Sequence, residues 1–151
     1  MTAKIIIKDL DGFSDQAGKE LFRSDPLLIT QERIQDFCRA VDNDEWVHWD
    51  EARCIAAGLG GIIMPAFMGP ALMSKAYFDH VELQNIEGLF AGVNRLRLIR
   101  PVTAGQSIYQ RWSVAEVTTR TRGIAVIYHV EWYGTDHDEP VIVADYVLRY
   151  W

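Results

Sequence analysis

Three stretches in the second half of the chain alternate apolar and polar residues, and this pattern limits the possible folds more than any other feature. The alternation has a period of two within residues 107–118, 122–133 and 140–151. It predicts β-strands that bury one face. The expected buried faces are Ile108, Trp112 and Val114; Ile124, Val126, Tyr128, Val130 and Trp132; and Val141, Val143, Val147 and Trp151. A sheet with one buried face should therefore form the body of the protein.

The connections between these stretches indicate how the strands pair. Residues 119–122 and 134–139 are short polar links, which predict antiparallel hairpin neighbours. A fourth strand is predicted over 89–100, because Pro101 would end it and the VTAG sequence at 102–105 is typical of a turn.

An apolar segment at 64–78 precedes the strands. A helix that is apolar on nearly all sides is usually buried in the middle of a fold. Proline is tolerated in a first helical turn and is costly later, so Pro70 predicts that the regular helix begins near Phe67 or Met68. Antiparallel strands around one apolar helix make an α+β architecture.

The first part of the chain is expected to hold smaller elements. A short strand is predicted at 27–29, and Thr30 is a suitable N-cap for a helix after it. The segment at 42–50, DNDEWVHWD, interrupts the helical pattern, and a helical turn is predicted over 51–57. The apolar face of the first helix is expected to consist of Ile34, Phe37, Cys38 and Val41.

Length, charge and cysteine content narrow the class of protein. A chain of 151 residues is expected to form one domain, 1–151. The net charge of -6 makes nucleic acid a poor partner, and no apolar run is long enough to cross a bilayer. Cys38 and Cys54 are expected to be reduced thiols in a cytoplasmic protein. No serine elbow, Walker loop, dinucleotide fingerprint or metal-ligand cluster is readable.

Three segments together resemble the MaoC-like family of R-specific enoyl-CoA hydratases and acyl dehydratases. The family's helix and loop, with an aspartate and a histidine five residues later, resemble ITQERIQDFCRAVDNDEWVHWD at 29–50. Its glycine-rich turn into a buried helix resembles GLGGIIMPAFMGPALM at 58–73, and its asparagine- and arginine-bearing strand resembles GLFAGVNRLRLIRPVTAGQSI at 88–108. The final IVADYVLRYW also looks like the family's last strand, so the resemblance extends over roughly 20–151.

The resemblance implies a hot-dog fold, in which an antiparallel sheet wraps around a long buried helix. It also implies a lyase that acts on an acyl thioester in a tunnel between two protomers. In this family an aspartate and a histidine activate a water that adds to a 2-enoyl thioester, and dehydration is the reverse reaction. No cofactor is expected beyond the coenzyme A or carrier phosphopantetheine of the substrate, and an acyl carrier protein is a candidate partner.

Carried over by position, the family's histidine is His48 and its aspartate is replaced by Asn43. An amide can orient a water but cannot accept its proton as a carboxylate does. Asp42 and Asp44 flank that position and would enter the site if the loop register is shifted. Ala66 stands at the start of the buried helix, where its N–H is expected to hold the thioester oxygen, because helix N-termini have free N–H donors.

Other residues are candidates for substrate binding on the same resemblance. They are Gly61, Asn94, Trp46, Met64 and Phe67, each of which has a plain structural role as its alternative. Arg95, Arg97 and Arg100 would either bind coenzyme A phosphates or a carrier's acidic surface, or form a solvated, salt-bridged face.

Two alternatives to a hydratase remain open from the sequence. One is another thioester enzyme on the same fold, such as a thioesterase. The other is a non-catalytic acyl-binding homologue that has lost the aspartate. A homodimer is expected in each case, because Tyr146, Tyr150 and Trp151 suggest that the last strand is an apolar edge that needs a partner.

Overall fold

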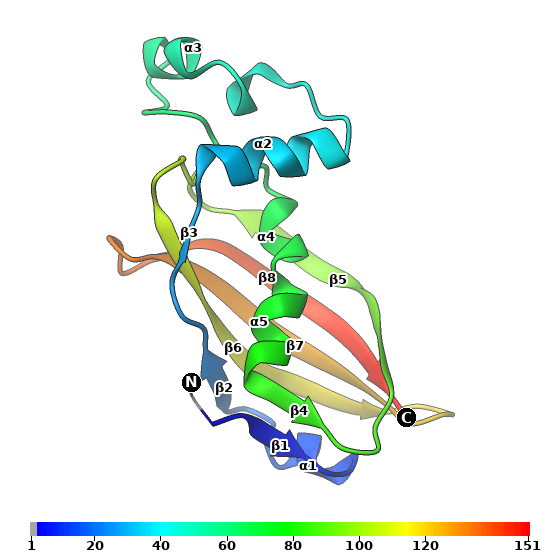
Figure 1. Cartoon of the computed structure of the whole chain (residues 1–151). Coiled ribbons are helices and arrows are strands. Elements are labelled where there is room, and N and C mark those ends of the chain that lie inside the picture. The colour runs from blue at the N-terminus through cyan, green and yellow to red at the C-terminus, as the bar shows by residue number, and fades with distance from the viewer. Residues whose placement is uncertain (1–2) are drawn as a thin grey trace.

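The computed structural model describes residues 3–151 and consists of one large antiparallel sheet with helices along one face (Figure 1). The sheet has six strands in the order β2-β6-β7-β8-β5, with β3 paired beside β6. These strands are β2 (Glu20–Arg23), β3 (Leu27–Leu28), β5 (Gly88–Leu98), β6 (Ser107–Thr119), β7 (Ile124–Gly134) and β8 (Pro140–Tyr150). A separate parallel pair is formed by β1 (Ile5–Ile7) and β4 (Val81–Leu83).

The predicted hairpins are confirmed, since β6 pairs antiparallel with β7 and β7 with β8. The predicted faces of the first two strands are also confirmed. Trp112, Tyr128 and Trp132 are completely buried on the side that the helices cover. These large aromatic rings contribute most of the apolar area that stabilises the sheet against the helices.

The predicted face of the last strand is wrong by one residue. Opposed residues of an antiparallel pair lie on the same face of the sheet, and Tyr146 of β8 is paired with Tyr128 of β7. The core side of β8 is therefore Ile142, Ala144, Tyr146 and Tyr150, all buried, whereas Val143 and Val147 are only half-buried on the other side. Because β8 carries apolar residues on both faces, alternation alone could not decide which face is buried.

The apolar segment forms two short helices in succession, α4 (Met68–Ala71) and α5 (Met73–His80), which cross the concave face of the sheet (Figure 1). The start at Met68 is as predicted, and it places Pro70 within the first turn. Gly69 allows close contact with the sheet, because a Cβ there would lie 2.9 Å from the Ile142 Cδ1 atom. The expectation that all sides are buried is wrong, since Phe67 and Phe78 are 72% and 60% exposed.

A cluster of tyrosine hydroxyls ties α5 to the sheet. The Tyr77 hydroxyl lies 3.1 Å from that of Tyr128 and 2.9 Å from that of Tyr150, and the last two are 2.9 Å apart. Each buried hydroxyl thus has hydrogen-bond partners, as a group removed from water requires. Burial raises the pKa of the Tyr77, Tyr128 and Tyr150 hydroxyls, so all three remain neutral.

The remaining elements lie at the two ends of the sheet (Figure 1). One end carries α1 (Asp11–Ser14), and α2 (Gln31–Ala40), the 3-10 turn η1 (Trp46–His48) and α3 (Glu51–Ala56) extend beyond the other end. Thr30 caps α2 as predicted, because its hydroxyl accepts the Arg33 N–H at 3.1 Å. None of the helices in the described chain is long and apolar enough to cross a membrane.

The last strand is not an edge of the sheet: β5 forms the edge beside it, and β2 and β3 form the opposite edge. β8 lies between β7 and β5, and both Tyr146 and Tyr150 are buried. The prediction that the last strand is an exposed apolar edge, on which the expected homodimer was based, is therefore wrong. On β5, Leu89 is 65% and Phe90 is 56% exposed, so an apolar edge is present there instead.

Candidate active site

His48 ends the 3-10 turn that follows α2, and it is 5% exposed. Its Nδ1 atom lies 2.6 Å from the carbonyl oxygen of Ile63, in the segment that leads to α4. A carbonyl oxygen can only accept a hydrogen bond, so Nδ1 must carry the proton. The neutral ring therefore has its lone pair on Nε2, which suits that atom for accepting a proton.

Asn43 reaches the same place from the end of α2, and its role in the loop is clear. Its Oδ1 atom accepts the backbone N–H of Glu45 at 3.1 Å, and its own carbonyl oxygen accepts the Trp49 indole N–H at 2.9 Å. The Asn43 side chain thus fixes the loop that leads into η1.

A pocket of about 410 Å³ joins these residues to the start of α4. Its lining residues are Phe37, Val41, Asn43, Glu45, His48, Pro65, Ala66 and Phe67. Asp42 and Asp44 are exposed and do not line it. In this structure Asn43, and neither flanking aspartate, lines the pocket together with His48.

Two backbone donors face no acceptor at this pocket. Among the described residues, neither the N–H of Ala66 nor that of Phe67 has a hydrogen-bond partner, whereas the N–H of Met68 donates to the Pro65 carbonyl at 3.0 Å. Free N–H groups beside a buried histidine can bind an oxygen that gains negative charge during a reaction.

The structure does not bring the other candidate residues into this pocket. Met64 is buried and its N–H donates to the Val102 carbonyl at 2.7 Å, while Gly61 packs beside Thr103. The Trp46 ring lies under the Arg53 guanidinium, 4.1 Å from the ring centroid. Asn94 is exposed on the edge strand. Within a single chain, the surroundings of these four residues therefore fit a structural role and not substrate binding.

The arginine cluster is largely engaged in ion pairs. Arg95 Nε donates to Asp145 at 2.6 Å, and Arg100 Nη2 donates to Glu139 at 2.5 Å. Arg97 donates to a backbone carbonyl and is exposed. This arrangement favours the salt-bridged face over a phosphate-binding cluster.

Asp145 is the centre of a charged network on the outer face of the sheet. Besides Arg95, the Nδ1 atom of His129 lies 2.7 Å from its other carboxylate oxygen. Burial alone would raise the pKa of the Asp145 carboxyl, but the hydrogen bonds from Arg95 and His129 outweigh burial and hold the pKa below its ordinary value. The network therefore stabilises the charged carboxylate and with it the pairing of β7, β8 and β5.

Glu45 is a site residue that the sequence did not indicate. Its Oε2 atom lies 3.9 Å from His48 Nε2, and its side chain lines the pocket. The only available signal was its spacing of three residues from His48. This spacing becomes informative once the segment is known to be a 3-10 turn, because side chains at i and i+3 then lie on one side.

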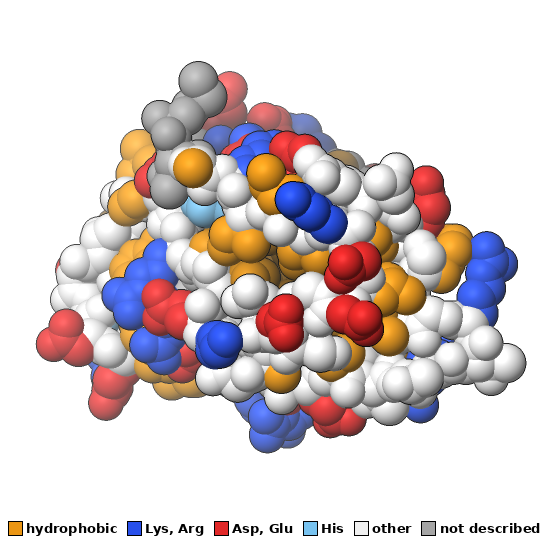
Figure 2. All heavy atoms as spheres, turned by 90° about the horizontal axis from the view of Figure 1, so that it is seen from below, with side chains coloured by type: hydrophobic (Ala, Val, Ile, Leu, Met, Phe, Trp, Pro, Cys, Tyr) orange, Lys and Arg blue, Asp and Glu red, His pale blue; other side chains and the backbone are white. Residues whose placement is uncertain are grey.

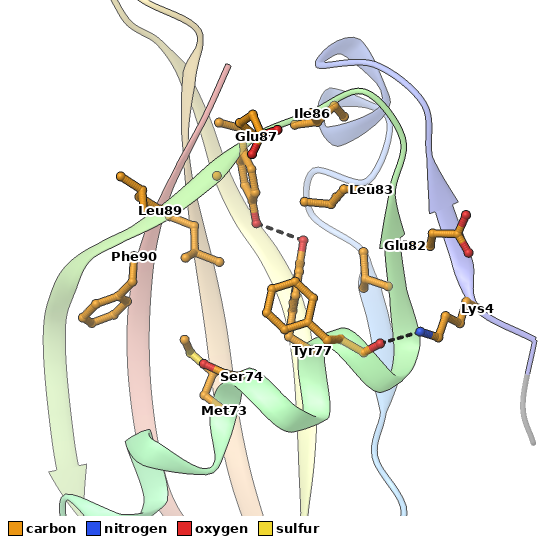
Figure 3. Close-up of a pocket in the computed structure, with 15 residues that line it drawn as sticks. Lys4, Met73, Ser74, Tyr77, Glu82, Leu83, Ile86, Glu87, Leu89 and Phe90 are labelled. Carbon is orange, nitrogen blue, oxygen red and sulfur yellow. Dashed lines mark hydrogen bonds between the residues drawn. The ribbon is translucent and has the colours of Figure 1, made fainter.

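A larger cavity, about 580 Å³, lies at the far end of α5, between that helix, β4 and the start of β5 (Figure 3). Figure 3 shows Met73 and Tyr77 on one side of it and Leu89 and Phe90 on the other. From this end the protein shows apolar side chains in a hollow among acidic ones (Figure 2). The described residues that line this cavity include no histidine or cysteine, and its ionisable side chains are those of Lys4, Tyr77, Glu82, Glu87 and Tyr150.

Comparison with known proteins identifies the family of this chain. A family model described as "FAS1-like, dehydratase domain region" matches residues 15–144. The 3-hydroxyacyl-thioester dehydratase Z of Mycobacterium tuberculosis is 28% identical over 138 residues, which are 89% of this chain and 90% of that protein. The predicted class of enzyme, a dehydratase or hydratase of acyl thioesters, is confirmed at the level of the family.

Solved structures confirm the fold. The (R)-hydratase from A. caviae involved in PHA biosynthesis has a TM-score of 0.73 at 13% identity and covers 88% of this chain and 95% of its own. The C-terminally truncated HadBC (3R-hydroxyacyl-ACP dehydratase) complex from Mycobacterium tuberculosis has a TM-score of 0.73 at 22% identity. The match covers 89% of this chain and 98% of that chain. The predicted hot-dog architecture is thus confirmed. This chain belongs to the family described as the FAS1-like dehydratase domain region, in agreement with its resemblance to MaoC-like enzymes.

Proposed function

We propose that this protein reversibly hydrates 2-enoyl thioesters to 3-hydroxyacyl thioesters in the His48 pocket. The observation that carries the proposal is the 2.6 Å contact between His48 Nδ1 and the Ile63 carbonyl, because it leaves the Nε2 lone pair free. The second support is the pair of unpartnered N–H groups of Ala66 and Phe67 in the described structure, which line the same pocket.

The reaction needs one proton to move twice. His48 Nε2 accepts a proton from water as the water oxygen bonds to C3 of the substrate. The electron pair of the C2–C3 double bond moves toward C2 and the thioester carbonyl, whose oxygen accepts the Ala66 N–H. The Nε2–H of the resulting imidazolium then protonates C2, so His48 returns to its neutral form and no other reactant is consumed.

The substrate class follows from the shape and composition of the pocket. Val41 and Phe67 are 54% and 72% exposed at its rim, and an acyl chain is the part of a thioester that would cover them. The thioester itself belongs to coenzyme A or to the phosphopantetheine of a carrier protein. A second copy of this chain is expected to pair at the β5 edge, because β5 has a hydrogen-bonded neighbour on one side only in the described structure.

The test is an activity screen with crotonyl-CoA and longer 2-enoyl thioesters. Loss of the enoyl absorbance, with appearance of the 3-hydroxyacyl product, supports the proposal. Release of free thiol without loss of the double bond would show a thioesterase instead. Measurable binding without turnover of any enoyl or 3-hydroxyacyl thioester would show an acyl-binding homologue and refute the proposal.

A further inference from the structure

The MaoC-like family that this chain resembles has an aspartate beside its histidine, whereas this chain has Asn43 at that position. The structure offers one carboxylate that could replace it. Glu45 Oε2 is 3.9 Å from His48 Nε2. Of the acidic residues in the 42–45 segment, Glu45 alone lines the pocket. Asp42 has a backbone φ of 54° in the left-handed region, and its side chain is exposed.

Two hydrogen bonds, one to the backbone N–H of Glu45 and one to its carbonyl oxygen, hold this residue in position. Its N–H is bound by the Asn43 side chain at 3.1 Å, and its carbonyl accepts the His48 N–H at 3.0 Å. Glu45 is therefore the N-cap of η1, and His48 is the third residue after it. Side chains at i and i+3 of a 3-10 turn are eclipsed, which puts this carboxylate and this imidazole on the same side.

The separation of the two groups suits one bridging water. A water at about 2.8 Å from each of two acceptors fits between atoms that are 3.9 Å apart. The Glu45 side chain is 62% exposed, whereas that of His48 is only 6% exposed.

We propose that Glu45 supplies the catalytic carboxylate in this protein, and that Asn43 positions it. This inference rests on the proposed hydration reaction. Glu45 accepts one hydrogen of the attacking water in a hydrogen bond, while His48 Nε2 removes the other hydrogen and later returns it to C2. The Asn43 amide does not exchange protons, and its task is to hold the Glu45 N–H.

The experiment compares the wild-type protein, Glu45→Gln and the double variant Asn43→Asp/Glu45→Gln. The single variant keeps the size of the side chain and removes its charge, so kcat/KM is expected to fall by about 10²-fold, with an unchanged unfolding midpoint. The double variant returns a carboxylate to position 43 and is expected to recover part of the lost rate.

Glu51→Gln is the matched control, since Glu51 is exposed at the start of α3 and does not line the pocket. Wild-type rates in Glu45→Gln, or a loss in Asp44→Asn that exceeds the loss in Glu45→Gln, would overturn the assignment. A wild-type protein that hydrates no enoyl thioester would refute the proposed function. The pairing is then still decided by the NMR chemical shifts of the His48 ring, which are expected to differ between the wild-type protein and Glu45→Gln. Identical shifts would show that the two groups do not interact.

Discussion

Two substitutions of His48 separate its chemical role from its structural one. His48→Ala removes the base and also the Nδ1–H donor to the Ile63 carbonyl. His48→Asn removes the base but keeps a donor, because the Asn side-chain amide nitrogen occupies nearly the same position as Nδ1. Both variants should lose about 10²–10⁴ in kcat/KM, which is the range for one acid–base group.

The stability of the two variants should differ. In His48→Ala the Ile63 carbonyl is left without its 2.6 Å partner next to a nearly buried position. An unpaired buried acceptor costs about 1–3 kcal/mol. In a domain of this size each kcal/mol lowers the unfolding midpoint by about 2–4 °C. His48→Asn should retain most of that stability.

The assays are crotonyl-CoA hydration for activity and thermal unfolding followed by circular dichroism for stability. His137→Asn is the matched control, because His137 lies in the loop between β7 and β8 and lines neither cavity. Wild-type turnover in His48→Asn would show that His48 is not the base. Equal loss of stability in both variants would show that the contact with Ile63 does not stabilise the fold.

Three further predictions concern the rest of the fold. Tyr128→Phe removes two of the three hydroxyl contacts made with Tyr77 and Tyr150, so the free energy of unfolding in urea should fall by about 1–3 kcal/mol; an unchanged value would mean that the cluster contributes nothing. Asp145 has a lowered pKa in the folded protein, so the stability from its ion pairs is complete above the ordinary value of 3.8 and is lost as the pH falls through the folded pKa. Asp145→Asn should therefore flatten the loss of stability below about pH 4, and an identical acid-unfolding curve would contradict the network described above. Phe90→Lys places a charge on the free β5 edge and should shift the protein from dimer toward monomer in light scattering, whereas a wild-type protein that is already monomeric at micromolar concentration would exclude the dimer.

Much of the fold was predictable because local patterns and tertiary packing agree there. The Thr30 cap, the start of α4 at Met68 and the two hairpins each depend on short-range rules, and all are confirmed. The last strand was assigned the wrong buried face because both of its faces are apolar. Only its register against β7, with Tyr146 opposite Tyr128, decides which face meets the helices.

The predicted active-site residues likewise fall into those that line the pocket in the structure and those that do not. The motif spacing indicated His48 and Asn43, and the structure places both at one pocket with Ala66. Asn94, Gly61, Met64 and Trp46 do not line that pocket in a single chain, because spacing in sequence does not say which side chains share a cavity. Glu45 was overlooked for the same reason.

The sequence by itself indicated the class of architecture, the family and His48 as the candidate acid–base residue, because period-two alternation, caps and motif spacing are local properties of the chain. The tertiary structure decided three other things. It showed that β5 and not β8 is an edge strand, that the Ile63 carbonyl assigns the proton of His48 to Nδ1, and that Glu45 Oε2 lies 3.9 Å from His48 Nε2. These depend on contacts between segments that are distant in sequence, or on the handedness and pitch of one short turn, and neither can be read from residue order alone.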